Sequence, residues 1–252
     1  MSSPLFSEKA FQASRTATYE GSMTLRGTVD KSIVLFATLL VTATWMWNRW
    51  GGTEGIEIAM NNGITGYMIG GLVIGLISVL VMSFKKSWAP YLAPVYAAAE
   101  GVLLGALSMF FEFMYPGIVM QAVGITIGIF ALMLIAYKTG VLRATPMFTK
   151  VLMMATFGVM IFYGLIWITS MFGFHGLSSF YGGSSLMSIG LSVVIAGIAA
   201  FNFILDFNFI EEQSKMGAPK YMEWYSGVAL LATLIWLYIE ILRLLAKLQS
   251  RD

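Results

Sequence analysis

The fold of this chain is decided by apolar stretches such as residues 185–206, which read SLMSIGLSVVIAGIAAFNFILD. This stretch carries no charged side chain before Asp206 at its end. A helix rises about 1.5 Å per residue, so about 20 apolar residues cross the hydrocarbon core of a bilayer. The stretch therefore predicts a transmembrane helix with a carboxylic acid near one end.

Six other stretches share this character. We predict seven transmembrane helices at about residues 32–48, 66–84, 90–111, 117–137, 148–171, 185–206 and 224–246. The expected fold is an all-α, seven-helix membrane bundle formed by residues 31–252. Residues 1–30 are polar and of mixed charge, without an apolar segment typical of a signal peptide, so we expect a disordered or weakly ordered tail.

The composition excludes several classes of protein. The chain has 252 residues, of which 58% are hydrophobic and 11% charged, whereas soluble domains carry about 25% charged residues. A net charge of +2 gives no reason to expect a nucleic-acid partner. The absence of cysteine excludes disulfides and thiolate metal sites, and the single histidine, His175, cannot build a zinc site. We expect no enzyme activity, no catalytic residue and no resident cofactor.

Positive charge predicts the orientation in the membrane. With the N-terminus inside, 11 of the 15 Lys and Arg residues fall on the inner side, and four (Arg49, Arg243, Lys247 and Arg251) fall outside. The positive-inside rule therefore favours a cytoplasmic N-terminus and an outer C-terminus, in a bacterial inner membrane. The basic C-terminal end disagrees with this rule, so a re-entrant segment is the alternative for the seventh span.

Glycines recur at four-residue spacing in several spans. The pairs are Gly66/Gly70, Gly71/Gly75, Gly101/Gly105 and Gly124/Gly128. Small residues at this spacing let neighbouring helices approach closely in a membrane. We interpret them as helix-packing positions and assign them no chemistry.

Three acidic residues lie in or at the ends of predicted spans, where a charge costs about 2.5–3.5 kcal/mol on insertion scales. Glu100 is about ten residues into the third span, between Ala99 and Gly101, near the bilayer midplane. A functional carboxyl and a hydrogen-bonded structural one are equally consistent with this position. Asp206 and Glu240 are the other two acids.

Asp206 ends the sixth span, and Asn202 lies four residues earlier on the same helical face. Two oxygen-bearing side chains among phenylalanines indicate a polar seam inside the bundle. The alternative is a carboxylate at a helix end, solvated by a loop that carries Glu211 and Glu212. We favour a functional Asp206, because an ionisable residue within a membrane is a candidate site by default.

Glu240 and Arg243 lie three residues apart in the seventh span, a spacing that allows an ion pair within the helix. A pair that neutralises two charges is the more common reason for this spacing. We therefore favour a structural role for Glu240 and Arg243 and keep them as candidate ion-path residues.

Three segments resemble one known family. Residues 96–105 (YAAAEGVLLG), 205–212 (LDFNFIEE) and 237–245 (LYIEILRLL) are similar to stretches of the Bax inhibitor-1 family, the transmembrane Bax inhibitor motif proteins. The resemblance covers about residues 66–248 and looks closest to a bacterial branch with an extended N-terminus. It implies six helices around a central C-terminal helix.

The resemblance also implies a pH-sensitive leak of cations, usually calcium, that is controlled by two neighbouring aspartates on the sixth and seventh helices. Asp206 matches the first of these aspartates. Alignment on Arg243 places Thr233 at the position of the second, and a threonine cannot share a proton with Asp206. A second carboxyl would then have to come from Glu100 or Glu240.

We expect a membrane protein that leaks cations through the interior of its bundle. Asp206 is the candidate calcium ligand, with Asn202 beside it, and calcium is the permeant ion rather than a cofactor, since calcium prefers oxygen ligands. The alternative is a non-conducting stress regulator that binds a membrane protease or translocon. The lipid bilayer is the partner that both readings require.

Overall fold

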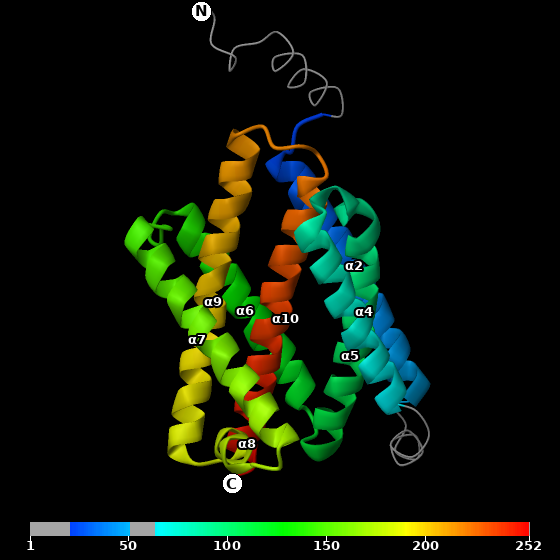
Figure 1. Ribbon diagram of the computed structural model, residues 1–252, viewed down its shortest axis with the longest axis vertical. Coiled ribbons are helices and arrows are strands. Elements are labelled where there is room, and N and C mark those ends of the chain that lie inside the picture. The colour runs from blue at the N-terminus through cyan, green and yellow to red at the C-terminus, as the bar shows by residue number, and fades with distance from the viewer. Residues whose placement is uncertain (1–20, 51–63, 252) are drawn as a thin grey trace, which may run out of the picture. The chain divides into compact units, whose positions relative to one another are not determined.

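The computed structural model describes residues 21–50 and 64–251, and helices make up most of this part of the chain (Figure 1). The long helices are α2 (Leu25–Trp50), α4 (Ile64–Phe84), α5 (Ala89–Met114), α6 (Ile118–Lys138), α7 (Pro146–Met171), α9 (Leu186–Lys215) and α10 (Met222–Gln249). Two short elements, η3 (Lys86–Trp88) and α8 (Gly176–Gly182), join them and were not predicted.

Seven of the described helices are long and apolar enough to cross a membrane. This confirms the all-α, seven-helix membrane fold and the seventh span as a full helix of 28 residues. The further expectation that six helices surround the last one stays a prediction.

The sixth membrane helix is longer than predicted, and this corrects the position of Asp206. Helix α9 continues to Lys215, so Asp206 lies nine residues before its last residue. Glu211 and Glu212 belong to the same helix rather than to a loop. Asp206 is therefore not a helix-end carboxylate.

The first membrane helix begins at Leu25, within the segment that we expected to be weakly ordered. The backbone N–H of Met23 donates to the carbonyl of Ala218 over 2.7 Å. The carboxylate of Glu223 accepts hydrogen bonds from the backbone N–H and the hydroxyl of Thr24, each 3.1 Å long. An acid at this position satisfies free N–H groups at the helix start. Residues 1–20 of the predicted tail lie outside the described residues.

The chain forms two compact units. Of the described residues, the first unit contains residues 21–50, 64–105 and Phe209–Leu231, and the second contains Ala106–Asn208 and residues 232–251. The boundaries fall inside α5, α9 and α10, so each of these helices contributes to both units.

Close helix contacts in the first unit depend on glycine. A side-chain carbon added at Gly71 of α4 would lie 2.8 Å from the carbonyl oxygen of Ala99 on α5. One added at Gly101 of α5 would overlap Thr42 and the carbonyl of Leu39 on α2. These positions confirm that some of the glycine pairs allow close approach. In contrast, Gly66, Gly70, Gly124 and Gly128 have no atom within 4 Å of an added side-chain carbon.

The second unit is held together by aromatic contacts between α6 and α9. The ring of Phe130 packs edge-on against Phe203 and Phe207, with centroid distances of 5.1 and 6.0 Å. Tyr137, two turns farther along α6, lies 5.6 Å from Phe207. These rings surround the part of α9 that carries Asp206.

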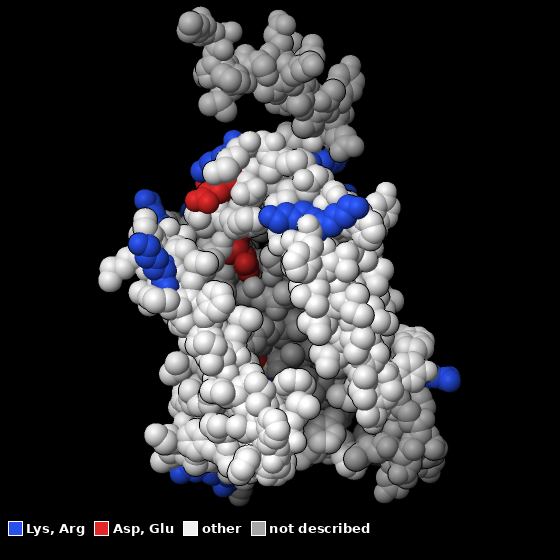
Figure 2. Space-filling model, viewed as in Figure 1, with Lys and Arg blue, Asp and Glu red and all other residues white. Residues whose placement is uncertain are grey.

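Apolar side chains dominate the outside of the membrane helices. Most of the face visible in Figure 2 is white, which marks side chains without charge. Large exposed side chains include Ile69 and Leu76 on α4, Leu132 on α6 and Met160 on α7. Such surfaces are stable against lipid, which supports the membrane location.

Candidate functional site

Asp206 has an incomplete set of hydrogen bonds. Its side chain accepts a hydrogen bond from Thr233 of α10, which belongs to the same unit. Its Oδ2 atom is buried and has no hydrogen-bond partner among the described residues. Most buried polar atoms in proteins are hydrogen-bonded, so an unpartnered carboxylate oxygen calls for an explanation such as a proton or an ion.

Asn202, one turn before Asp206, has other partners. Its Nδ2 donates to the hydroxyl of Thr156 on α7 over 2.9 Å and to the carbonyl of Ile198 over 2.8 Å. These bonds fix the orientation of the amide and link α9 to α7. Asn202 and Asp206 thus share a helical face, as predicted, but each is bonded to a different neighbouring helix.

The carboxylate of Glu240, unlike that of Asp206, is fully surrounded by groups that compensate its charge. It is 1% exposed. The hydroxyls of Tyr163 and Tyr181 donate to its two carboxylate oxygens over 2.5 and 2.9 Å. The guanidinium of Arg243 lies 3.2 Å from Oε1 and also donates to the hydroxyl of Tyr181 over 2.7 Å. The pair predicted from sequence is therefore the centre of a larger polar cluster.

Lys247 extends this cluster by one more turn of α10. It is 4% exposed, and its ammonium donates to the hydroxyls of Ser188 and Ser192 over 2.9 and 2.7 Å. It also lies 4.1 Å from the ring centre of Tyr181, a favourable cation–π distance. Lys247 is thus a buried cation rather than the exposed end of a span.

Tyr181 joins the short helix α8 to this cluster. Its ring is buried against Phe162 and its carbonyl accepts from the hydroxyl of Ser188 over 2.9 Å. Burial raises the pKa of the Tyr181 hydroxyl above its ordinary value of 10.0, although nearby Arg243 opposes this effect. The hydroxyl therefore stays protonated and donates to Glu240 at neutral pH.

Sequence reasoning missed most of this cluster. Tyr163, Tyr181, Ser188 and Ser192 come from separate segments, and no local pattern connects them. One signal was present: Glu240 and Lys247 are seven residues apart, so they lie on the same face of a helix.

Glu100 belongs to the first unit, in α5. The hydroxyl of Tyr96, one turn earlier, donates a hydrogen bond to it. A side-chain carbon added at Gly75 of α4 would lie 3.0 Å from its Oε1 atom, so the glycine makes room for the carboxyl. Glu100 is therefore a hydrogen-bonded acid between two helices of this unit.

The structure brings Asp206 together with Thr233, at the position where the resemblance implied a second aspartate. Glu240 is seven residues beyond Thr233, which is about 10.5 Å along the helix. It therefore does not form a carboxyl pair with Asp206. The described residues also contain no group of three or more His, Asp or Glu side chains that could hold a metal ion.

Comparison with known protein families gives one match. A family model described as Bax inhibitor 1 like matches residues 3–250 of the chain. No curated protein and no solved structure matches the chain.

Proposed function

The chain belongs to the Bax inhibitor 1 like family. From this premise we propose that it leaks cations, calcium in particular, across a membrane, and that Asp206 lies on the path of these cations. The family match and the seven membrane helices support this proposal. The proposed orientation has a cytoplasmic N-terminus and an outer C-terminus in a bacterial inner membrane, on the basis of the distribution of Lys and Arg.

The observation that carries the proposal is the unpartnered Oδ2 of Asp206, in a membrane-spanning helix. An ionised carboxylate away from water is strongly unfavourable without a compensating charge. A passing cation or a bound proton would supply that compensation. The hydroxyl of Thr233 and the amide oxygen of Asn202 are nearby neutral oxygens, the ligand type that calcium prefers.

A threonine opposite Asp206 changes what proton binding can do. Two facing carboxyls can share one proton and so form a pH-sensitive pair. Asp206 and Thr233 have only one carboxyl between them, so proton uptake would simply neutralise Asp206. We propose that the leak responds to pH through this single acid, less steeply than a two-acid pair would.

Two cations, the buried Lys247 and the partly exposed Arg243, limit the path at the other end of the second unit. Arg243 and Lys247 lie one and two turns beyond Glu240 along α10. Positive side chains oppose the passage of cations. We therefore propose that this conformation is closed at the Arg243 end and that conduction requires a rearrangement there.

Calcium flux in proteoliposomes tests the proposal. Vesicles that enclose a calcium indicator would be prepared with the unchanged protein, with Asp206→Asn and with Glu211→Gln. Glu211 is a matched control, because it is an acid on the same helix that pairs at the surface with Lys215. We expect Asp206→Asn to lower the flux by about tenfold or more, as loss of about 1.4 kcal/mol of ion stabilisation would.

Flux that is equal in all three proteins would contradict the role of Asp206. A Thr233→Asp variant provides a second test, because it places two acids opposite each other. We expect this variant to respond more steeply to pH than the unchanged protein does, when flux is measured between pH values of about 5 and 8.

The alternative function is a non-conducting regulator that binds a membrane protease or translocon. One observation favours it: only 11% of the most apolar stretch of α7 is buried within the structure, so most of this helix can contact lipid or another membrane protein. Absence of flux, together with stoichiometric copurification of one membrane protein from native membranes, would favour this alternative over the leak.

A further inference from the structure

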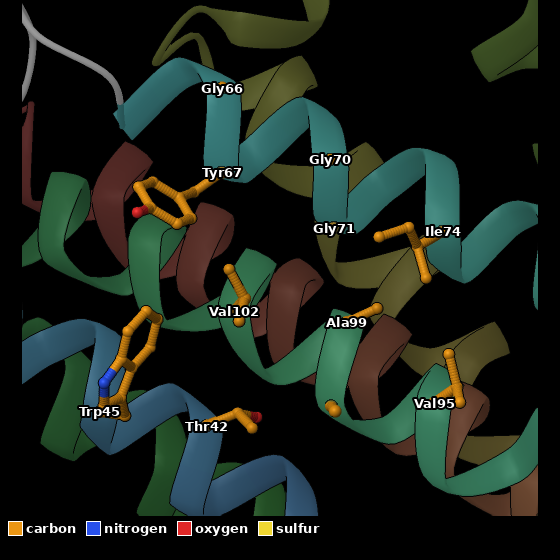
Figure 3. A pocket seen from close by; sticks show the side chains of 11 residues that line it. Thr42, Trp45, Gly66, Tyr67, Gly70, Gly71, Ile74, Val95, Ala99 and Val102 are labelled. Carbon is orange, nitrogen blue, oxygen red and sulfur yellow. The ribbon is translucent and has the colours of Figure 1, made fainter.

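An apolar groove in the first unit has no role in the proposed leak. It has a volume of about 640 Å³ and lies between α2 and α4, with α5 as its floor (Figure 3). Its walls include Thr42 and Trp45 of α2 and Gly70 of α4, and its floor includes Ala99 and Val102 of α5. Asp206 belongs to the second unit, so the groove is a separate candidate site.

The lining of the groove suits hydrocarbon. Its only hydroxyl on α2, that of Thr42, already donates to the backbone carbonyls of Thr38 and Leu39 over 3.1 Å each. Gly66 and Gly70 face space in which an added side-chain carbon meets no atom within 4 Å. All three helices are membrane spans, so the groove lies in a region where lipid chains are the surrounding solvent.

The shape of the groove favours a narrow occupant over a helix. At one end the rings of Trp45 and Tyr67 meet edge to face, with their centroids 6.2 Å apart, so the two walls touch there (Figure 3). A helix with its side chains is about 10–12 Å across. A helix could not lie along the groove past these two rings, whereas a narrow, flexible acyl chain can enter the groove beside them.

The same end has the features of a membrane–water interface. Tryptophan and tyrosine prefer the level of the lipid headgroups. Arg49 lies one helical turn beyond Trp45 and is exposed. A guanidinium at this place complements the phosphate of a lipid whose chain enters the groove beside Trp45.

From the groove, its narrow aromatic end and Arg49, we propose that the first unit binds one anionic phospholipid. One acyl chain of this lipid lies between α2 and α4, and its phosphate lies at Arg49. The other candidate occupant, a helix of a second copy of the chain, is an outcome that the experiment distinguishes.

Lipid binding is measured first on the full chain in dodecyl maltoside micelles by native mass spectrometry, with phosphatidylglycerol as the added lipid. The test variant is Gly70→Leu, whose side chain would fill the groove. The control is Gly124→Leu on α6, a membrane-helix glycine with equally open space around it. We expect one retained lipid on the unchanged protein and on Gly124→Leu, and about tenfold weaker retention on Gly70→Leu.

Fluorescence places the lipid in the groove. Trp45 is kept, the other six of the seven tryptophans are changed to phenylalanine, and phosphatidylglycerol with brominated chains is titrated. We expect saturable quenching of Trp45 that Gly70→Leu removes. Equal lipid retention by Gly70→Leu and the unchanged protein would overturn the proposal. The proposal would also be overturned if the unchanged protein retained no lipid and instead formed a cross-linked dimer that Gly70→Leu abolishes. If phosphatidylcholine is retained as well as phosphatidylglycerol and Arg49→Gln has no effect on retention, the proposed preference for an anionic headgroup would be wrong.

Discussion

Asp206 on α9 and Glu240 on α10 are both acids inside membrane helices, yet their surroundings differ in kind. Glu240 accepts hydrogen bonds from two tyrosines and pairs with Arg243. Asp206 has one hydrogen bond from Thr233 and one buried oxygen without a partner among the described residues. A satisfied carboxylate holds structure together, whereas an unsatisfied one remains available to a proton or a cation.

This difference explains why an acid in a membrane helix is not by itself a functional site. The charge of Glu240 is balanced within its own cluster, so removal of Glu240 leaves the partly buried cation of Arg243 without its carboxylate. Among the described residues, Asp206 has a hydrogen bond from Thr233 and no charge partner of this kind. We therefore propose a role in stability for Glu240 and a role in function for Asp206, and the following variants test that division.

The largest effect is expected for Glu240→Ala. This change leaves Arg243 without its carboxylate. Breaking a fully buried pair in this way costs about 3–5 kcal/mol of the free energy of unfolding, and because the Arg243 side chain is 31% exposed we expect the lower end of that range. Reversible unfolding in mixed detergent micelles would measure it. The control is Glu211→Ala, which breaks the exposed pair with Lys215 and should cost less than about 1 kcal/mol.

A double variant checks the cause of that loss. If the unpaired cation is responsible, Glu240→Ala combined with Arg243→Met should be more stable than Glu240→Ala alone. A double variant that is less stable than either single one would contradict the interpretation of Glu240 as a charge partner.

A smaller effect is expected for Tyr181→Phe, which removes one hydroxyl that donates to Glu240 and accepts from Arg243. Hydrogen bonds to charged groups contribute about 1.5–3 kcal/mol to the free energy of unfolding. Because folding raises the pKa of this hydroxyl, its contribution is fully present below pH 10.0 and declines as the pH rises through the folded value. The difference in stability between the unchanged protein and Tyr181→Phe should therefore be constant near neutral pH and shrink above pH 10.0.

The smallest effect on stability is expected for Asp206→Asn. An amide keeps an acceptor for Thr233 and removes a charge that has no partner, so the free energy of unfolding should stay within about 1 kcal/mol of the original value. Calcium flux should nevertheless fall, as proposed above. A loss of several kcal/mol would show that Asp206 is a structural residue like Glu240, and the comparison would then fail.

The comparison also shows which inferences sequence patterns support. Glu240 and Arg243 were predicted as a pair because their spacing is local to one helix, and the structure places them 3.2 Å apart. The length of α9 was underestimated, because the charged residue Asp206 ends the apolar stretch while the helix continues to Lys215. Hydrophobicity marks where a helix meets lipid, and it does not mark where the helix ends.

The sequence by itself determined the class of fold: seven apolar stretches must become helices, because a backbone in lipid has to satisfy its hydrogen bonds within each segment. It also determined the family and the short list of intramembrane acids. Only the tertiary structure decided how completely Glu240 is satisfied, because Tyr163 and Tyr181 come from two other segments and meet at Glu240 only when the second unit folds. Partners that lie far apart in the chain have no spacing that a sequence can reveal.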